Sequence, residues 1–329
     1  MTERKTDEIT RGQQNNTAGQ SIASATAKKV AVYAFSNEQV GRQKKSGSAR
    51  RRRRAADSAI YILLTVLGIV WVLPIIYLVY TAFRVTPDTG IINKLIPDGL
   101  TLGVSNFKRL FTDTMFPLWL KNTLIVSVSS CVITTAFILM VSYALSRLRF
   151  RLRKPIMNVL LVLGMFPGFM SMIAVYFILK AMGLTNSLLA LILVYSGSAG
   201  LSYYICKGFF DTLPRAMEEA AFLDGANQPT IFFKITLPLA KPVVVYTVLT
   251  SFISPWCDFI FVNTIINDRE KFTVALGLFK LINEEKSSFN ANFTVFCAGA
   301  CVVGGIIVTL FMSMQRYYVE GVTSGAVKG

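Results

Sequence analysis

The stretch Asn122–Ser146, NTLIVSVSSCVITTAFILMVSYALS, contains 25 residues and not one charge. A helix needs about 20 apolar residues to cross the roughly 30 Å of hydrocarbon in a bilayer. Because a segment in lipid must satisfy its own backbone hydrogen bonds, such a run is expected to be helical. The stretch therefore predicts a membrane-spanning helix.

Five further runs have a similar length, and only one of them contains a charge, Asp258. They are Ser58–Phe83, Pro155–Leu179, Ala181–Cys206, Pro242–Ile266 and Ser287–Gln315. Hydrophobic residues make up 53% of the 329 residues and charged residues 16%, against about 45–50% and about 25% in soluble domains. The sequence predicts an all-α polytopic membrane protein with six transmembrane helices, since a soluble protein with buried helices seldom contains such runs.

Basic residues are distributed unevenly along the chain. It has 34 lysines and arginines and a formal net charge of +16. If the N-terminus is placed inside the cell, 24 of the 34 fall in cytoplasmic segments, as the positive-inside rule requires. We therefore expect both termini to be cytoplasmic. The basic charge is then a topology signal in a lipid membrane, and no nucleic acid is needed to explain it.

Residues 1–56 are polar and end in a basic cluster, Arg50–Arg54. A segment of this composition cannot bury enough apolar surface to fold alone. It is predicted to be a disordered basic cytoplasmic tail, followed by a six-helix transmembrane domain over residues 57–329. The basic cluster could bind anionic lipid headgroups, or it could act only as a stop signal that fixes topology. The second interpretation is favoured.

Several kinds of chemistry are missing from the sequence. The chain has no histidine, which excludes Ser-His-Asp and Cys-His catalysis and histidine-ligated zinc. Its five cysteines form no CxxC pair and are interpreted as small apolar packing residues rather than as disulfides. No Gly-x-x-x-x-Gly-Lys-Ser/Thr loop is present to bind ATP phosphates. The sequence thus predicts neither an enzyme nor a metal or cofactor site.

The cytoplasmic segment 207–241 is too long for a simple connection between two spans. Pro214 suits the first turn of a helix, with Asp211 or Thr212 as a nearby cap. Residues 215–223 are rich in helix formers. A short helix is therefore expected on the cytoplasmic surface, just beyond the fourth apolar run.

Gly225 is expected to end this helix, and Asn227 to cap a second short helix that ends at Leu237–Pro238. The first helix is acidic, whereas helices that lie in the lipid interface favour lysine and arginine. This indicates a docking surface for a basic partner. Three carboxylates are expected to be exposed on it: Glu218, Glu219 and Asp224.

The same segment carries a spaced motif. It reads Glu219-Ala220-Ala221, three residues, Gly225, nine residues, then Ile235-x-Leu237-Pro238. This resembles the EAA loop of binding-protein-dependent ABC importer permeases, in which an aspartate, here Asp224, precedes the glycine. The resemblance covers about residues 60–329.

Other parts of the chain resemble the MalG-like branch of these permeases, which imports oligosaccharides. They are Trp119-x-x-Asn122-Thr123, residues 143–150, Met165-Phe166-Pro167 and residues 315–329. A further group looks most like maltodextrin permeases of Gram-positive bacteria: residues 255–259, 275–279, 292–294 and 298–300. The tail of more than 50 residues departs from the family, whose tails are usually shorter, and its role is unassigned.

The resemblance implies a type I ABC importer permease fold with a cytoplasmic EAA coupling loop. The chain would be the permease subunit of an ATP-driven oligosaccharide importer, with maltodextrin as the favoured substrate, in the cell membrane of a bacterium. Its partners would be a MalF-like second permease, a cytoplasmic ABC ATPase dimer and an extracellular sugar-binding protein. ATPase coupling would involve Glu218, Glu219, Ala220, Ala221, Asp224, Gly225, Ile235, Leu237 and Pro238.

Two features on the outer side are less specific. The loop of about residues 267–292 enters the binding protein in such relatives, or it is an ordinary polar loop. Asp258 lies 17 residues beyond Lys241, about 25 Å along a helix, and so near the outer edge of the hydrocarbon. Asp258 and the adjacent Trp256 are either pathway or gate residues or interface residues at headgroup depth.

Other functions remain open at this stage. A self-sufficient secondary transporter or channel often shows inverted repeats and buried ion-coupling charges, but no convincing repeat is visible and Asp258 is the one intramembrane carboxylate. A membrane enzyme would lack histidine and a carboxylate cluster. Within the ABC family, another sugar or a glycerol phosphate could use the same scaffold.

Overall fold

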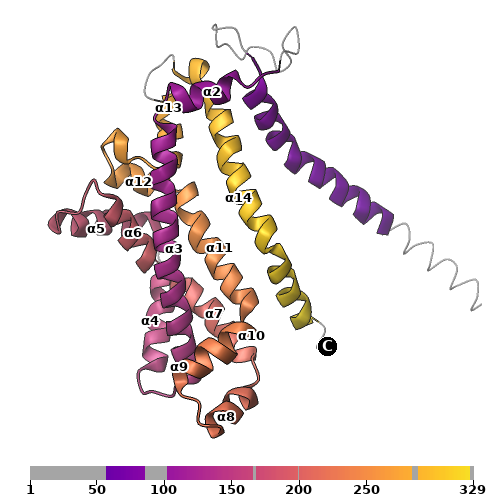
Figure 1. Cartoon of the computed structure of the whole chain (residues 1–329), viewed down its shortest axis with the longest axis vertical. Helices are drawn as coiled ribbons and strands as arrows, with labels where there is room; N and C mark the ends of the chain where they lie inside the picture. Colours follow the sequence, from indigo (N-terminus) through magenta and orange to yellow (C-terminus); the bar gives the residue numbers. More distant parts are fainter. Residues whose placement is uncertain (1–56, 86–101, 166–167, 199, 284–287, 327–329) are drawn as a thin grey trace, which may run out of the picture. The chain divides into compact units, whose positions relative to one another are not determined.

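The computed structural model describes residues 57–85, 102–165, 168–198, 200–283 and 288–326 (Figure 1). These residues form helices and connecting turns, and an isolated bridge pairs Arg84 with Leu102. The predicted disordered tail, 1–56, lies outside the described residues. Contacts divide the chain into two units, residues 1–75 and 76–329.

The first helix runs from Asp57 to Phe83 and is apolar around its whole circumference. None of the residues in its most apolar 18-residue window is buried within the chain. A helix that is apolar on every side is suited to lipid. The predicted first span, Ser58–Phe83, coincides with this helix.

The larger unit contains a series of helices with the following bounds. They are α2 Ser105–Thr112, α3 Phe116–Arg147, α4 Arg153–Met165, α5 Gly168–Ala181, α6 Leu188–Gly197, α7 Gly200–Thr212, α8 Arg215–Leu223, α9 Gln228–Ile231, α10 Leu237–Leu239, α11 Lys241–Cys257, α12 Ile260–Ile265, α13 Val274–Asn283 and α14 Ser288–Ala326. A π-helical turn, η1, covers Phe232–Thr236, and a 3₁₀ turn, η2, covers Arg269–Lys271.

Three of the six predicted spans are continuous helices. Within the described ranges, Asp57–Phe83, Phe116–Arg147 and Asn292–Tyr317 are each long and apolar enough to cross a membrane. Up to six spans result if each pair of bent helices counts as one. The count of six therefore stays a prediction, and the third, fourth and fifth apolar runs are not single helices.

The fifth run, Pro242–Ile266, breaks for a local reason. Helix α11 ends at Cys257 because Asp258 takes an extended backbone conformation, with ψ of 108°. The carboxylate of Asp258 then accepts a hydrogen bond from the backbone N–H of Phe261, at 3.0 Å. That bond satisfies one of the free N–H groups at the start of α12, and so favours a new helix over continuation of the old one.

Helices α3 and α11 pack against each other, α3 also packs against α7, and α11 against α14. Figure 1 shows α8, α9 and α10 together at one end of α3, and α2 and α13 at its other end. A buried apolar cluster lies at each end. The cluster beside α8–α10 joins α3, α7, η1 and α11 through Ile138, Leu139, Tyr143, Cys206, Phe210, Phe232, Ala240 and Val243.

Candidate functional site

Helix α8, Arg215–Leu223, ends as predicted but begins later and without the predicted cap. Pro214 is the N-cap residue and no side chain caps the helix. Asp211 and Thr212 belong to the last turn of α7, which continues to Thr212. Their side chains are used there, since Asp211 accepts a hydrogen bond from Ser146 at 2.6 Å and Thr212 donates to the carbonyl of Phe209 at 2.7 Å.

The end of α8 confirms the role of Gly225 as a helix stop. Gly225 has φ of 87°, a conformation that glycine adopts without steric cost. Its N–H donates to the carbonyl of Phe222 at 3.0 Å, and the N–H of Ala226 donates to the carbonyl of Ala221 at 2.9 Å. These two bonds form a Schellman motif. Asp224 is the C-cap residue and is exposed.

The segment after Gly225 begins as predicted but ends later. The side chain of Asn227 accepts a hydrogen bond from the N–H of Thr230 at 2.9 Å and so caps α9. The helix does not stop at Leu237–Pro238. It continues through η1 and α10 to Leu239, with Pro238 near the start of α10. The chain then bends by 85° into α11.

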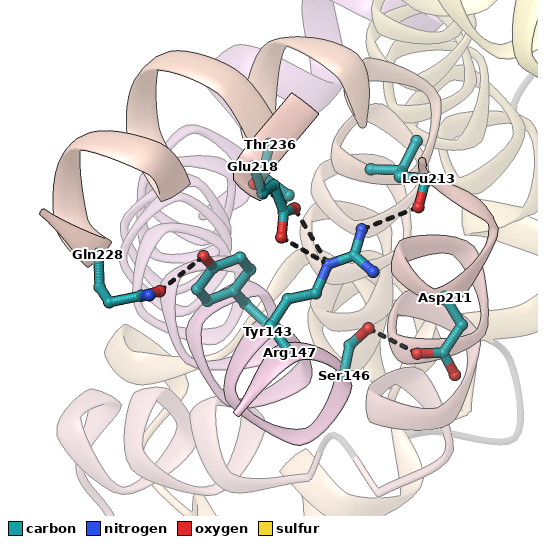
Figure 2. A network of polar contacts seen from close by, with 8 residues as sticks. All are labelled: Tyr143, Ser146, Arg147, Asp211, Leu213, Glu218, Gln228 and Thr236. Carbon is teal, nitrogen blue, oxygen red and sulfur yellow. Dashed lines mark hydrogen bonds and ion pairs between the residues drawn. The ribbon is translucent and has the colours of Figure 1, made fainter. Parts of the chain in front are cut away.

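An ion pair joins α8 to the end of α3. Nε of Arg147 lies 3.0 Å from both carboxylate oxygens of Glu218, and Nη2 of Arg147 donates to the carbonyl of Leu213 at 3.1 Å (Figure 2). The side chains of Arg147 and Glu218 are only 5% and 14% exposed. Oγ1 of Thr236, in η1, donates to the same carboxylate at 2.9 Å.

The prediction that Glu218 is exposed is therefore wrong. Its position on α8 turns the carboxylate towards α3 and η1, where it accepts hydrogen bonds from two donors, Nε of Arg147 and Oγ1 of Thr236. Glu219, one residue later, is exposed as predicted. The two neighbouring glutamates thus have different environments, which their adjacency in the sequence could not show.

Further hydrogen bonds extend this network along the last turns of α3. The hydroxyl of Tyr143 donates to Oε1 of Gln228 at 3.1 Å, and that of Ser146 donates to Asp211 (Figure 2). The sequence does not show these partners. Arg147 follows a long apolar run and lies in the family-like stretch 143–150, and a basic residue at that point also has the reach to bind the adjacent acidic helix.

The outward face of α8 is apolar as well as acidic. Phe222 is 62% exposed and Leu223 87% exposed, and Met217 and Ala220 are exposed beside Glu219. The predicted acidic surface therefore contains large apolar side chains that nothing in the described chain covers. An open pocket of about 430 Å³ lies between this face and the end of α3, lined by Tyr143, Arg147, Leu148, Arg215, Glu218, Glu219, Phe222, Leu223, Gln228 and Ile231.

The last three motif residues lie on the segment that leads into α11. Ile235 and Leu237 are half-buried and Pro238 is exposed. Leu237 packs against the apolar cluster between α3, α7 and α11. This part of the motif connects the coupling segment to the central helices.

Trp256 and Asp258 lie at the opposite end of α11 from the coupling segment, so the structure does not bring the two predicted sites together. Trp256 is buried, and its ring centroid lies 5.7 Å from that of Phe252. One oxygen of Asp258 accepts the hydroxyl hydrogen bond of Tyr195 at 3.0 Å, and the other binds the N–H of Phe261. Both carboxylate oxygens therefore have partners.

The start of α3 holds the outer loop in place. The indole N–H of Trp119 donates to the carbonyl of Arg269 at 3.0 Å, and the amide of Asn122 donates to the carbonyls of Glu270 and Phe272. Oγ1 of Thr123 accepts the N–H of Val274 at 2.8 Å. The sequence indicated this trio only as a resemblance, and the structure gives it a role.

The chain matches known proteins over most of its length. Residues 135–323 match the family described as binding-protein-dependent transport system inner membrane component. The maltodextrin transport system permease protein MalD of Streptococcus pneumoniae is 33% identical over 276 residues, 83% of this chain and 96% of that protein. The galactooligosaccharides transport system permease protein GanQ of Bacillus subtilis is 31% identical over 274 residues, 82% and 94% respectively.

A solved structure shows the same fold. It is a bacterial ABC transporter involved in the import of the acidic polysaccharide alginate, with a TM-score of 0.68 and 22% identity over 80% of this chain and 97% of that one. The family match extends from α3 into α14 and includes the whole segment 207–241. These findings favour an ABC importer permease over a self-sufficient transporter, a channel or an enzyme. The chain belongs to the family of inner membrane components of binding-protein-dependent ABC importers.

Proposed function

We propose that this chain forms half of the translocation pathway of an ATP-driven oligosaccharide importer whose substrates are maltodextrins. The chain would lie in the cell membrane of a bacterium with both termini in the cytoplasm. The names of the relatives that match more than four fifths of the chain support an oligosaccharide. GanQ makes a galactooligosaccharide the second candidate; another sugar or a glycerol phosphate would use the same scaffold.

The partners of the complex would be a MalF-like second permease, a dimer of cytoplasmic ABC ATPase subunits and an extracellular sugar-binding protein. The observation that carries the ATPase assignment is the outward face of α8. Exposed Phe222 and Leu223 beside the carboxylate of Glu219 form the mixed surface expected at a protein interface. A carboxylate on this face disfavours burial against an anionic leaflet.

Within the coupling loop the residues would have distinct roles. Glu219 would pair with a basic group of the ATPase, and the small side chains of Ala220 and Ala221 would allow close approach. Gly225, with Asp224 before it, would let the chain turn sharply after α8. The rest of the motif would pass the motion on to α11: Ile235, Leu237 and Pro238.

On the outer side, Trp256 and Asp258 would bound the end of the pathway, with Asp258 holding α11, α12 and Tyr195 together. The loop after α12, which Trp119 and Asn122 hold at residues 269–272, would contact the binding protein. Its firm attachment to α3 supports this, because a loop that transmits binding must be tied to the pathway helices.

The test is uptake in a strain that lacks this chain. The strain is complemented with the wild type and supplied in turn with labelled maltotetraose, a galactooligosaccharide and glycerol 3-phosphate. We expect uptake of the maltodextrin. Glu219→Lys should abolish uptake and weaken recovery of the ATPase in a detergent pull-down, while Asp113→Lys, an equal charge reversal at an exposed residue beyond the other end of α3, should not. Normal transport by Glu219→Lys would refute the docking role.

A further inference from the structure

The attachment of α8 to the rest of the chain is unusual. Its large apolar side chains face outward, so apolar packing does little to hold the helix against α3. Among the residues that the structure describes, Glu218 is the one α8 side chain with a hydrogen bond or ion pair to another element. This single carboxylate therefore makes the polar connection between the docking helix and the central helices.

Glu218 contacts the end of α3 directly, and it contacts η1, which leads through α10 into α11. Arg147 is the last residue of α3, and Thr236 is the last residue of η1, four residues before the 85° bend into α11. Since α3 and α11 pack along each other, a displacement of Glu218 would act on the pair as a unit. Figure 2 shows the carboxylate between the guanidinium and Thr236.

We propose that the bridge Arg147–Glu218–Thr236 transmits movement from α8 to α3 and α11, so that these three are positioning residues for transport and not docking residues. This inference rests on the proposed function, in which α8 binds an ATPase. A rigid-body shift of a packed helix pair needs a stiff connection at the point where the force is applied.

Burial explains why a charged pair can serve here. A buried ion pair adds little stability compared with apolar residues of similar size, but loss of one partner leaves an unpaired buried charge. The network has a further restraint, because Nη2 of Arg147 also binds the carbonyl of Leu213. Rotation of α8 away from α3 would break the bonds from Arg147 and Thr236 to Glu218 together, so these bonds favour movement of α8 with α3.

The decisive variant is the neutral pair Arg147→Met with Glu218→Gln. It leaves no unpaired charge, so it separates a structural role from a transmitting role. The importer is purified with its partner subunits and reconstituted into proteoliposomes, and ATP hydrolysis and sugar uptake are measured together. We expect normal co-purification of the ATPase and largely retained hydrolysis, but uptake lower by about tenfold. Uptake at the wild-type level would overturn the proposal.

Two more variants keep the outcome clear. If the neutral pair fails to assemble with its partner subunits, Thr236→Val provides the test. It keeps the buried shape and the ion pair but removes the hydrogen bond between η1 and Glu218. The number of ATP molecules hydrolysed per sugar molecule taken up should rise, and a ratio equal to that of the wild type would overturn the proposal. The matched control is Lys207→Met, which breaks a neighbouring ion pair that does not reach α8 and leaves the bond from Ser146 to Asp211 in place, and it should keep the wild-type ratio.

Glu219→Lys distinguishes this inference from the function on which it rests. If Glu219→Lys still binds the ATPase and transports, the docking role has failed. If it loses the ATPase while the neutral pair at 147 and 218 transports normally, only the transmitting role has failed. Loss of ATPase binding by Glu219→Lys, together with loss of coupling by the neutral pair, supports both the docking role and the transmitting role.

Discussion

Trp119 leaves no room for a side chain at Gly277: a Cβ built on that glycine would lie 2.2 Å from Cε3 of the indole. Trp119 cannot simply move aside, because its indole N–H is bound to the carbonyl of Arg269. Gly277 lies in α13, which follows the outer loop. The pair therefore sets how closely α13 approaches α3.

Gly277→Ala should destabilise the protein although alanine is the better helix former. Overpacking of this kind typically costs about 1–3 kcal/mol, which exceeds the gain of about 1 kcal/mol in helix propensity. The thermal midpoint of the purified chain in detergent should fall. Gly208→Ala is the matched control, since a Cβ there meets nothing within 4 Å, and its midpoint should be unchanged or higher.

Substitution of Gly225 should act through backbone strain. A Cβ at this position meets nothing within 4 Å in the chain itself, but φ is 87°. The left-handed region costs about 1–2 kcal/mol for most residues and less for asparagine. Gly225→Val should therefore weaken the end of α8 and reduce sugar uptake, whereas Gly225→Asn should retain more uptake. Equal uptake by the two variants, at equal membrane levels, would contradict this explanation.

Some of these features could be predicted from the sequence because they depend on short segments. The presence of α8, the stop at Gly225 and the cap at Asn227 follow from helix propensity, backbone freedom and a side chain that reaches three residues along. The apolar runs likewise identified membrane segments. In each case the residues of the segment itself set the free-energy difference between the observed local structure and its alternatives.

Other features depend on contacts that local patterns do not encode. Glu218 and Glu219 are chemically identical neighbours, and the positions of Arg147 and Thr236 on other elements decide which one is largely buried. The break at Asp258 has a local cause, but the hydrogen bond that Asp258 accepts from Tyr195, 63 residues earlier, does not. An uncharged run predicts that a helix lies in the membrane, but it does not show where that helix bends.

The loop around Asp268 should respond to acid. Hydrogen bonds from Lys271 and Asn186 hold the pKa of Asp268 below its usual value. A carboxyl group with a lowered pKa stabilises the folded loop above its unfolded pKa of about 3.9, and that contribution is lost as the pH falls through the lower folded value. Protection of the Asn267 and Asp268 amides, which bind Oδ1 of Asn186, should be constant from about pH 7 to pH 5 and fall below about pH 4.

Hydrogen exchange at these two amides measures the effect. Asp268→Asn removes the titrating group, so its protection should be lower than that of the wild type near neutral pH and independent of pH. A wild type whose protection falls between pH 7 and pH 5 would show that another group controls the loop.

Asp258 should act by its hydrogen bonds and not by its charge. It accepts one bond from the hydroxyl of Tyr195 and one from the N–H of Phe261, and an asparagine can accept one of these through its amide oxygen, whereas an alanine can accept neither. Loss of both acceptors leaves two partly buried donors unpaired, at up to about 1–3 kcal/mol each. Asp258→Ala should therefore lower the thermal midpoint and the rate of sugar uptake more than Asp258→Asn.

Tyr195→Phe completes the comparison, because it removes the donor and leaves the carboxylate charged. If hydrogen bonding is what matters, Tyr195→Phe and Asp258→Asn should be similarly mild, and the double variant should cost less than the sum of the two single changes, since both remove the same bond. A gate that works by the carboxylate charge predicts the opposite order, in which Asp258→Asn stops uptake and Tyr195→Phe does not. Uptake and thermal midpoints of the four proteins, measured at matched membrane levels, distinguish these two roles for Asp258.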